Sequence, residues 1–350
     1  MVPPLRPWRL QGAHGRVPLS FMATAVKEGA DQVIVPYSEV SAIEQIMIFP
    51  RQIMIRTLFT RSRTMNELNE RLCDAVMHSD DMEMQRCFQA GAQTNSADCN
   101  GWTPLHFASS CADARIAHLL IRHGGDVDVR DRGGLAPLHI AALRCRPDIV
   151  RLLLQAGSAP DLRDQYGVTP LFLAAGAGDE DTVRLLLHAG ADVTLADSLG
   201  YNALHWAAGN RNPEVACVLL DAGTPLHSAE SEGMSALHLA VLGGSASVAA
   251  LLLKRGIDID ARDSSGQTAL HLAVQQGSVE MVGLLVKAGA GVLEVNDAGN
   301  APIDIAEAEG DAALLHVLRS GREGLAGDDA GYAWPLRADR WRRGRRVGGF

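Results

Sequence analysis

Along most of this chain, hydrophobic and polar positions follow a pattern that repeats every 33 residues. Around Leu120, the residues Ile116, Leu119 and Leu120 lie three and four positions apart, which places them on one face of a helix. Leu105 and Ala108 are predicted to face inward on a shorter helix that precedes it. The leucine of the longer helix recurs at Leu120, Leu153, Leu186, Leu219, Leu252, Leu285 and Leu318. Each interval therefore predicts two helices that pack on each other and on the next pair, in a stacked array.

Polar and small residues that bound these helices keep the same interval. A tetrapeptide close to Thr-Pro-Leu-His begins the first helix at 103–106, 136–139, 169–172, 202–205, 235–238, 268–271 and, in altered form, 301–304. Thr, Ser or Asn supplies an N-cap oxygen, and proline at the first helical position lacks only a donor that would be unpaired anyway. Gly124 and its equivalents are expected to end the second helix, because glycine adopts the left-handed conformation of a C-cap without steric cost. Asp98 to Gly101 predicts a tight turn at a projecting hairpin tip.

With these tetrapeptides, glycines and leucines, the chain resembles the ankyrin repeat family. The resemblance implies an all-α solenoid with short hairpin turns, in which the histidine of the tetrapeptide hydrogen-bonds backbone at the turn. We expect about eight units: an amino-terminal cap at 66–98, six full repeats at 99–296 and a capping repeat at 297–320. Asp304, Glu307 and Glu309 give this last unit the polar character that suits the end of an array.

The flanks differ from the array in charge. The 350 residues carry a formal net charge of −9; residues 1–65 carry +4 and residues 321–350 carry +3, which leaves −16 for the array between them. An acidic array disfavours nucleic acid and mildly favours basic partner proteins, although solubility alone also explains the charge.

Residues 1–65 are predicted to be a poorly structured flank, and residues 321–350 a disordered basic tail. The first flank is interpreted as an extension, as a chain preceding a start near Met65, or as a mitochondrial targeting segment. The tail carries a basic cluster that suits nuclear import or contact with an acidic surface, against the alternative of a solvated tail. The cluster consists of Arg340, Arg342, Arg343, Arg345 and Arg346.

Cysteine usage and hydropathy indicate the cellular compartment in which the protein is expected. The six cysteines show no zinc-site spacing, and neither a disulfide framework nor a convincing secretory signal is evident. We therefore expect a reducing compartment, namely the cytoplasm, with the nucleus as an alternative. No membrane span is predicted, because the apolar stretch 46–59 is short and contains Pro50, Arg51 and Arg56.

Candidate catalytic groups are absent from the sequence pattern. The histidines that could suggest catalysis or metal binding recur at one equivalent position, one repeat apart: His106, His139, His205, His238 and His271. No nucleophile elbow, phosphate-binding loop or cluster with metal-ligand spacing appears. We therefore predict a protein that is not an enzyme and that needs no cofactor, metal or small-molecule substrate.

A binding surface is expected on positions that vary from unit to unit. The residue after each turn glycine is predicted to point outward, and with two neighbouring tip residues it forms an apolar ladder: Trp102, Leu135, Tyr166, Val168, Leu199, Tyr201 and Met234. Leu143, Arg144 and Leu242 are expected to face the concave side, beside a shallow groove around Gly176 and Gly209. The alternative is that the ladder packs between adjacent hairpins.

These features predict a protein-binding module that acts as scaffold, adaptor or inhibitor and binds through the hairpin tips and the concave face. The alternative function is a substrate-recognition or regulatory subunit of an enzyme complex such as a ubiquitin ligase. A third hypothesis is nucleic-acid contact through the arginine-rich tail.

Overall fold

The computed structural model describes residues 66–111 and 113–324, which form sixteen helices and no strand. Within this part of the chain, one isolated antiparallel bridge joins Ala229 and Ser235. The predictions made for residues 1–65, for residues 325–350 and for the arginine cluster of the tail lie outside the described residues. The all-α fold expected from the 33-residue pattern is confirmed.

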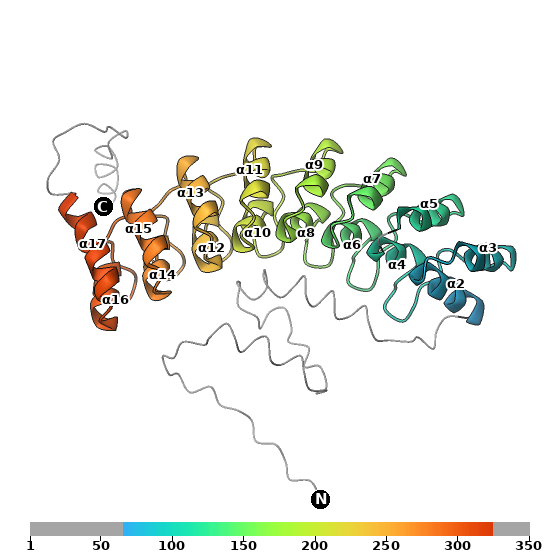
Figure 1. Cartoon of the computed structure of the whole chain (residues 1–350), viewed down its shortest axis with the longest axis horizontal. Coiled ribbons are helices and arrows are strands. Elements are labelled where there is room, and N and C mark those ends of the chain that lie inside the picture. Colours follow the sequence, from blue (N-terminus) through green and yellow to red (C-terminus); the bar gives the residue numbers. More distant parts are fainter. Residues whose placement is uncertain (1–65, 112, 325–350) are drawn as a thin grey trace, which may run out of the picture. The chain divides into compact units, whose positions relative to one another are not determined.

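The helices form eight consecutive pairs, each with a first and a second helix. The first helices are α2 (Glu67–Met77), α4 (Pro104–Ser110), α6 (Pro137–Leu143), α8 (Pro170–Ala177), α10 (Ala203–Gly209), α12 (Ala236–Gly243), α14 (Ala269–Gln275) and α16 (Pro302–Glu309). The second helices are α3 (Asp81–Gln89), α5 (Ala114–Arg122), α7 (Pro147–Gln155), α9 (Glu180–His188), α11 (Pro213–Asp221), α13 (Ala246–Lys254), α15 (Val279–Lys287) and α17 (Ala312–Gly324). Helix α17 ends four residues beyond 320, the limit expected for the last unit. Figure 1 shows the pairs side by side in chain order, with first helices packed on first helices and second helices on second helices.

Five of the eight first helices begin with a hydrogen bond to their own histidine. The backbone N–H of Thr103 donates to Nδ1 of His106 at 3.1 Å, and four other units repeat this bond with their own tetrapeptides. Several second helices begin with a polar N-cap; for example, Asp113 Oδ1 accepts from the backbone N–H of Arg115 at 3.0 Å. The tetrapeptide therefore starts the helix through its side chains as well as through proline.

The core lies between the two rows of helices. All seven leucines of the repeated series, from Leu120 to Leu318, are fully buried. Gly124 ends α5 with φ +83°, as the C-cap prediction requires. A further turn joins the two helices of a unit, and its left-handed residue is Gly178, Gly244, Gly277 or Gly310 in four units but Ser79, Cys145 or Arg211 in three others. Three units therefore place a side chain on backbone that favours glycine.

Among residues 66–111 and 113–324, no helix combines the length and the apolar character that crossing a membrane requires.

Candidate partner-binding surface

The hairpins between units are held by a buried or half-buried acid at their base. Asp164 Oδ1 accepts from the backbone N–H of Tyr166 at 2.9 Å and of Val168 at 2.8 Å. Equivalent bonds are made by Asp131, Asp197, Glu230, Asp263 and, through its amide oxygen, Asn296. Burial raises the pKa of Asp164 and of Asp197 to about 6, since the apolar surroundings penalise the charged form. The turn is thereby fixed from within by a side chain.

Neighbouring hairpins are joined by backbone hydrogen bonds. The N–H of Gln165 donates to the carbonyl of Gly133 at 3.0 Å, and the N–H of Ser198 donates to the carbonyl of Tyr166 at 2.8 Å. Gly134 has φ +82°, and a Cβ on it would lie 2.8 Å from the nitrogen of Gln165. Only glycine meets both requirements, so the hairpins form one closely spaced row.

In the first five hairpins the residue that follows the turn glycine points into the array, and the outward direction expected for these residues from the sequence is wrong. Trp102, Leu135, Val168, Tyr201 and Met234 are all buried, with at most 8% of their surface exposed. The indole Nε1 of Trp102 donates to Asp131 of the next hairpin at 3.0 Å. The positive φ at the glycine turns the chain back, so these side chains pack between adjacent hairpins, which is the alternative that the sequence left open. Of the predicted ladder, Tyr166 and Leu199 are half-buried.

In six hairpins the residue two positions before the turn glycine has an exposed side chain. These residues are Arg132, Gln165, Ser198, Ser231, Ser264 and Asp297. This row is polar, begins with a cation and ends with an anion. Sequence reasoning missed it, although a signal was available: this position holds a polar residue in all six hairpins.

Arginines tie the tips together. Arg163 Nη2 donates to the carbonyl of Ala196 in the next hairpin at 3.0 Å, and Arg130 donates in the same way to the carbonyl of Arg163. Both side chains stay exposed. The rigid row of tips therefore presents guanidinium groups near its amino-terminal end.

The concave side holds the other predicted contact residues. Leu143, Arg144 and Leu242 are half-buried at the ends of their first helices. The groove expected around Gly176 and Gly209 is filled: a Cβ on Gly176 would lie 3.0 Å from the ring of Trp206, and one on Gly243 would lie 2.6 Å from the carbonyl of Gly209. These glycines therefore allow adjacent first helices to pack closely and do not open a groove.

The repeated histidines serve the hairpins. Nε2 of His106 lies 3.0 Å from the carbonyl of Leu135, 29 residues later, and His139, His238 and His271 make the equivalent contact with the next hairpin. Nε2 of His205 lies 3.2 Å from the carbonyl of Ser228 instead. Burial lowers the pKa of His139 and of His205 to about 4, so both rings are neutral at pH 7 and donate from Nε2. Among the described residues, no group of three His, Cys, Asp or Glu side chains is arranged to hold a metal ion.

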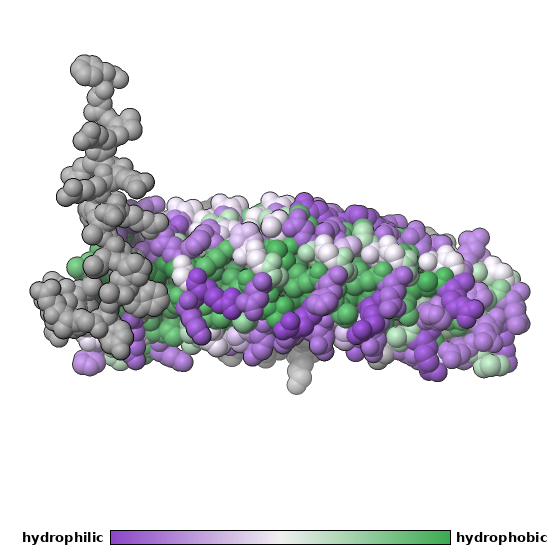
Figure 2. Space-filling view, turned by 90° about the horizontal axis from the view of Figure 1, so that it is seen from above, coloured by the Kyte–Doolittle hydropathy of each residue, from purple (hydrophilic) through white to green (hydrophobic). Residues whose placement is uncertain are grey.

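The side of the array that carries the second helices was not singled out from the sequence. Figure 2 shows a hydrophobic band that runs along this side between hydrophilic side chains. The second helices carry half-buried leucines at positions such as Leu152, Leu154, Leu185 and Leu187. Because adjacent second helices pack on each other, part of this apolar surface is used within the array.

Three comparisons relate this chain to known proteins. The family model for ankyrin repeats, which represents three copies, matches residues 72–164, 147–229 and 222–297. The crystal structure of the ankyrin repeat domain of Bcl-3, described as a unique member of the IkappaB protein family, is similar with a TM-score of 0.55 and 30% sequence identity, over 63% of this chain and 99% of that chain. The RelA-associated inhibitor of Mus musculus is 53% identical over 38 residues, which are 11% of this chain and 5% of that protein. The match therefore spans a small part of that relative.

Proposed function

This chain belongs to the ankyrin repeat family, and we propose that it is a binding module that holds a partner protein as scaffold, adaptor or inhibitor. The observation that carries the proposal is the row of exposed tips, which runs from arginine and glutamine through three serines to aspartate while the hairpins beneath repeat the same hydrogen bonds. A fixed frame with variable exposed positions is the arrangement from which a solenoid builds recognition.

The partner surface proposed here combines the tips with Leu143, Arg144 and Leu242 on the first helices. Arg132 and Arg163 favour acidic groups on the part of the partner that meets the first repeats. We further propose that the chain acts by binding alone, without chemistry of its own, and that it does so in the cytoplasm or the nucleus.

RelA is a first partner to test, because one relative is named as an inhibitor associated with it. The full chain is titrated with purified RelA by calorimetry, using wild type, Arg132→Ala and Arg151→Ala. Arg132 is an exposed tip residue, whereas Arg151 is an exposed arginine of the second helix α7 and serves as the matched control.

We expect Arg132→Ala to weaken the complex by at least about 1 kcal/mol, roughly fivefold in Kd. Arg151→Ala should leave Kd unchanged. If RelA does not bind, the proteins that the wild type captures from a cell lysate are compared with those captured by each of the two variants. Equal loss of binding in both variants, or in neither, would contradict the tip surface.

A further inference from the structure

Contacts between the last two units show which positions face the following unit. Asp260 Oδ1 accepts from the backbone N–H of Gly291 at 2.9 Å, and Arg262 Nη2 donates to Asp297 Oδ1 at 3.3 Å. On the second helices, a Cβ on Gly283 would lie 4.0 Å from Cγ1 of Val317. Positions 260, 262 and 283 thus point along the array toward its carboxyl-terminal end.

The equivalent positions of the last unit, 33 residues later, are Leu293, Val295 and His316. No further helical pair follows them within the described residues. Leu293 is 56% exposed and Val295 is 48% exposed. Three earlier hairpins have Asn95, Asp128 or Asp161 where the last has Leu293, and each of these accepts a backbone N–H of the next hairpin. Where these earlier hairpins form a polar contact with the next hairpin, the last hairpin therefore has exposed apolar surface.

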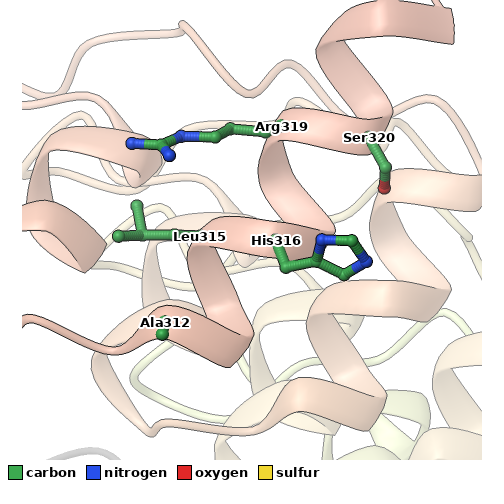
Figure 3. Close-up of a pocket in the computed structure, with 5 residues that line it drawn as sticks. All are labelled: Ala312, Leu315, His316, Arg319 and Ser320. Atoms are coloured by element: carbon green, nitrogen blue, oxygen red, sulfur yellow. The ribbon is translucent and has the colours of Figure 1, made fainter.

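Helix α17 extends this surface. It has thirteen residues, whereas the other second helices have nine each. A shallow pocket of about 450 Å³ lies along one side of it, and Figure 3 shows that all five lining residues come from α17: Ala312, Leu315, His316, Arg319 and Ser320. His316 places this pocket on the same end of the array as Leu293 and Val295. We call Leu293, Val295, Leu315 and His316 the end face.

The last unit, which carries the end face, is acidic. Residues 291–320 contain six acids and one arginine, a net charge of −5. The acids are Glu294, Asp297, Asp304, Glu307, Glu309 and Asp311, and all except the half-buried Asp311 are exposed. An occupant of this end must therefore combine apolar side chains with positive charge.

The segment that follows α17 has both properties. Residues 325–350 contain Tyr332, Trp334 and Leu336, followed by the five-arginine cluster, and carry a net charge of +3. The twelve residues from 325 to 336 span up to about 40 Å when extended. Because α17 is about 20 Å long, the aromatic residues can return along its whole length.

We propose that the end face is covered by the carboxyl-terminal segment 325–350 of the same chain. Tyr332 and Trp334 contact Leu293, Val295 and Leu315, and the arginine cluster lies against acids of the last unit. The contact occupies the arginines, so any acidic surface or import factor that recognises them competes with the end face. The tail thereby regulates its own basic cluster.

The test places a photo-crosslinking amino acid at Trp334 of the full chain, with Trp8 as the control position in the other flank. Equal amounts of isotopically light and heavy chain are mixed, irradiated and analysed by mass spectrometry. We expect crosslinks from position 334 to residues 291–300 and 312–320, between peptides of the same isotope. Mixed light and heavy crosslinks would show that a second copy is the occupant, and crosslinks spread over the array would show that the end face is not preferred. Either result overturns the proposal.

A second measurement uses hydrogen exchange on native side chains. Trp334→Ala should speed amide exchange in residues 291–300 on the order of tenfold, whereas Trp8→Ala should not. The variant Leu293→Asn with Val295→Ala, which gives the last hairpin the residues that stand at Asn95 and Ala97 in the first, should abolish the crosslink. Unchanged exchange with Trp334→Ala would overturn the proposal. All of these experiments use the chain alone, so they do not depend on the partner proposed above.

Discussion

Asp164 and Asp197 are carboxylates buried at the base of two central hairpins, although each occupies the place of a simple hydrogen-bond acceptor. Asn296 shows that a neutral group suffices there, since its Oδ1 accepts from the backbone N–H of Ala298 at 3.1 Å and of Asn300 at 3.0 Å. The negative charge on the two aspartates therefore lowers the stability of the fold, and the hydrogen bonds can form without it.

Asp164→Asn should raise the free energy of unfolding at pH 7.5. Burial raises the pKa of Asp164 from its ordinary value of 3.8 to about 6, so the folded chain binds this proton more tightly than the unfolded chain does. The contribution of Asp164 to stability consequently rises as pH falls from about 7 to about 4. The variant should gain about 1–3 kcal/mol at pH 7.5 and nothing near pH 4, as measured by urea unfolding at several pH values. A variant that is less stable than wild type at pH 7.5 would contradict this.

Cys145 lies at the turn between α6 and α7 with φ +53°, where Gly178 lies in the next unit. Cys145→Gly should raise the free energy of unfolding by up to about 1 kcal/mol, because relief of the left-handed strain exceeds the entropy that glycine adds to the unfolded chain. Cys145→Ser keeps the strain and removes only the thiol, so its melting temperature should match wild type. A stabilising serine would assign the effect to the sulfur.

At the scale of the hairpin, the structure places Trp102 in the hydrophobic core, whereas the sequence predicted a contact with a partner. Its ring is 7% exposed and packs with Leu135, Ile140 and Phe107. Trp102→Ala should lower the free energy of unfolding by about 3–5 kcal/mol. Arg132→Ala, at the neighbouring tip, should change it by less than about 0.5 kcal/mol. Thermal unfolding of the two variants separates core from surface, and an unchanged melting temperature for Trp102→Ala would reverse the assignment.

The elements themselves could be predicted because their signals are local. The leucine of seven second helices and the tetrapeptide of their partner helices act within a few residues. The structure buries all seven leucines, and five units make the histidine hydrogen bond. The direction of Trp102 or Tyr201 depends instead on the next hairpin, which closes over the side chain from 33 residues away. In five successive hairpins of an otherwise acidic array, the residue after the turn glycine is apolar, and this pattern itself indicates burial.

At the scale of the whole array, stability is the sum of pairs and of the interfaces between them. The exposed tip row and the end face both follow from this linear order, since the first repeats a position along the stack and the second belongs to the last of the described helical pairs. Neither is visible in a single unit, which is why the sequence pattern of one repeat did not reveal them.

Leu186 in α9 and Leu318 in α17 test that order, because both are fully buried and occupy the same repeat position. Either leucine replaced by alanine should cost about 2–5 kcal/mol locally. In the centre, the loss weakens the coupling between two halves, so Leu186→Ala should split urea unfolding into two transitions. At the end of the array, Leu318→Ala should speed hydrogen exchange in α16 and α17 alone, because only one interface between units involves that pair of helices. If both variants lowered one shared transition by the same amount, the array would unfold as a single cooperative unit, and the linear model would have to give way to one in which every interface is coupled.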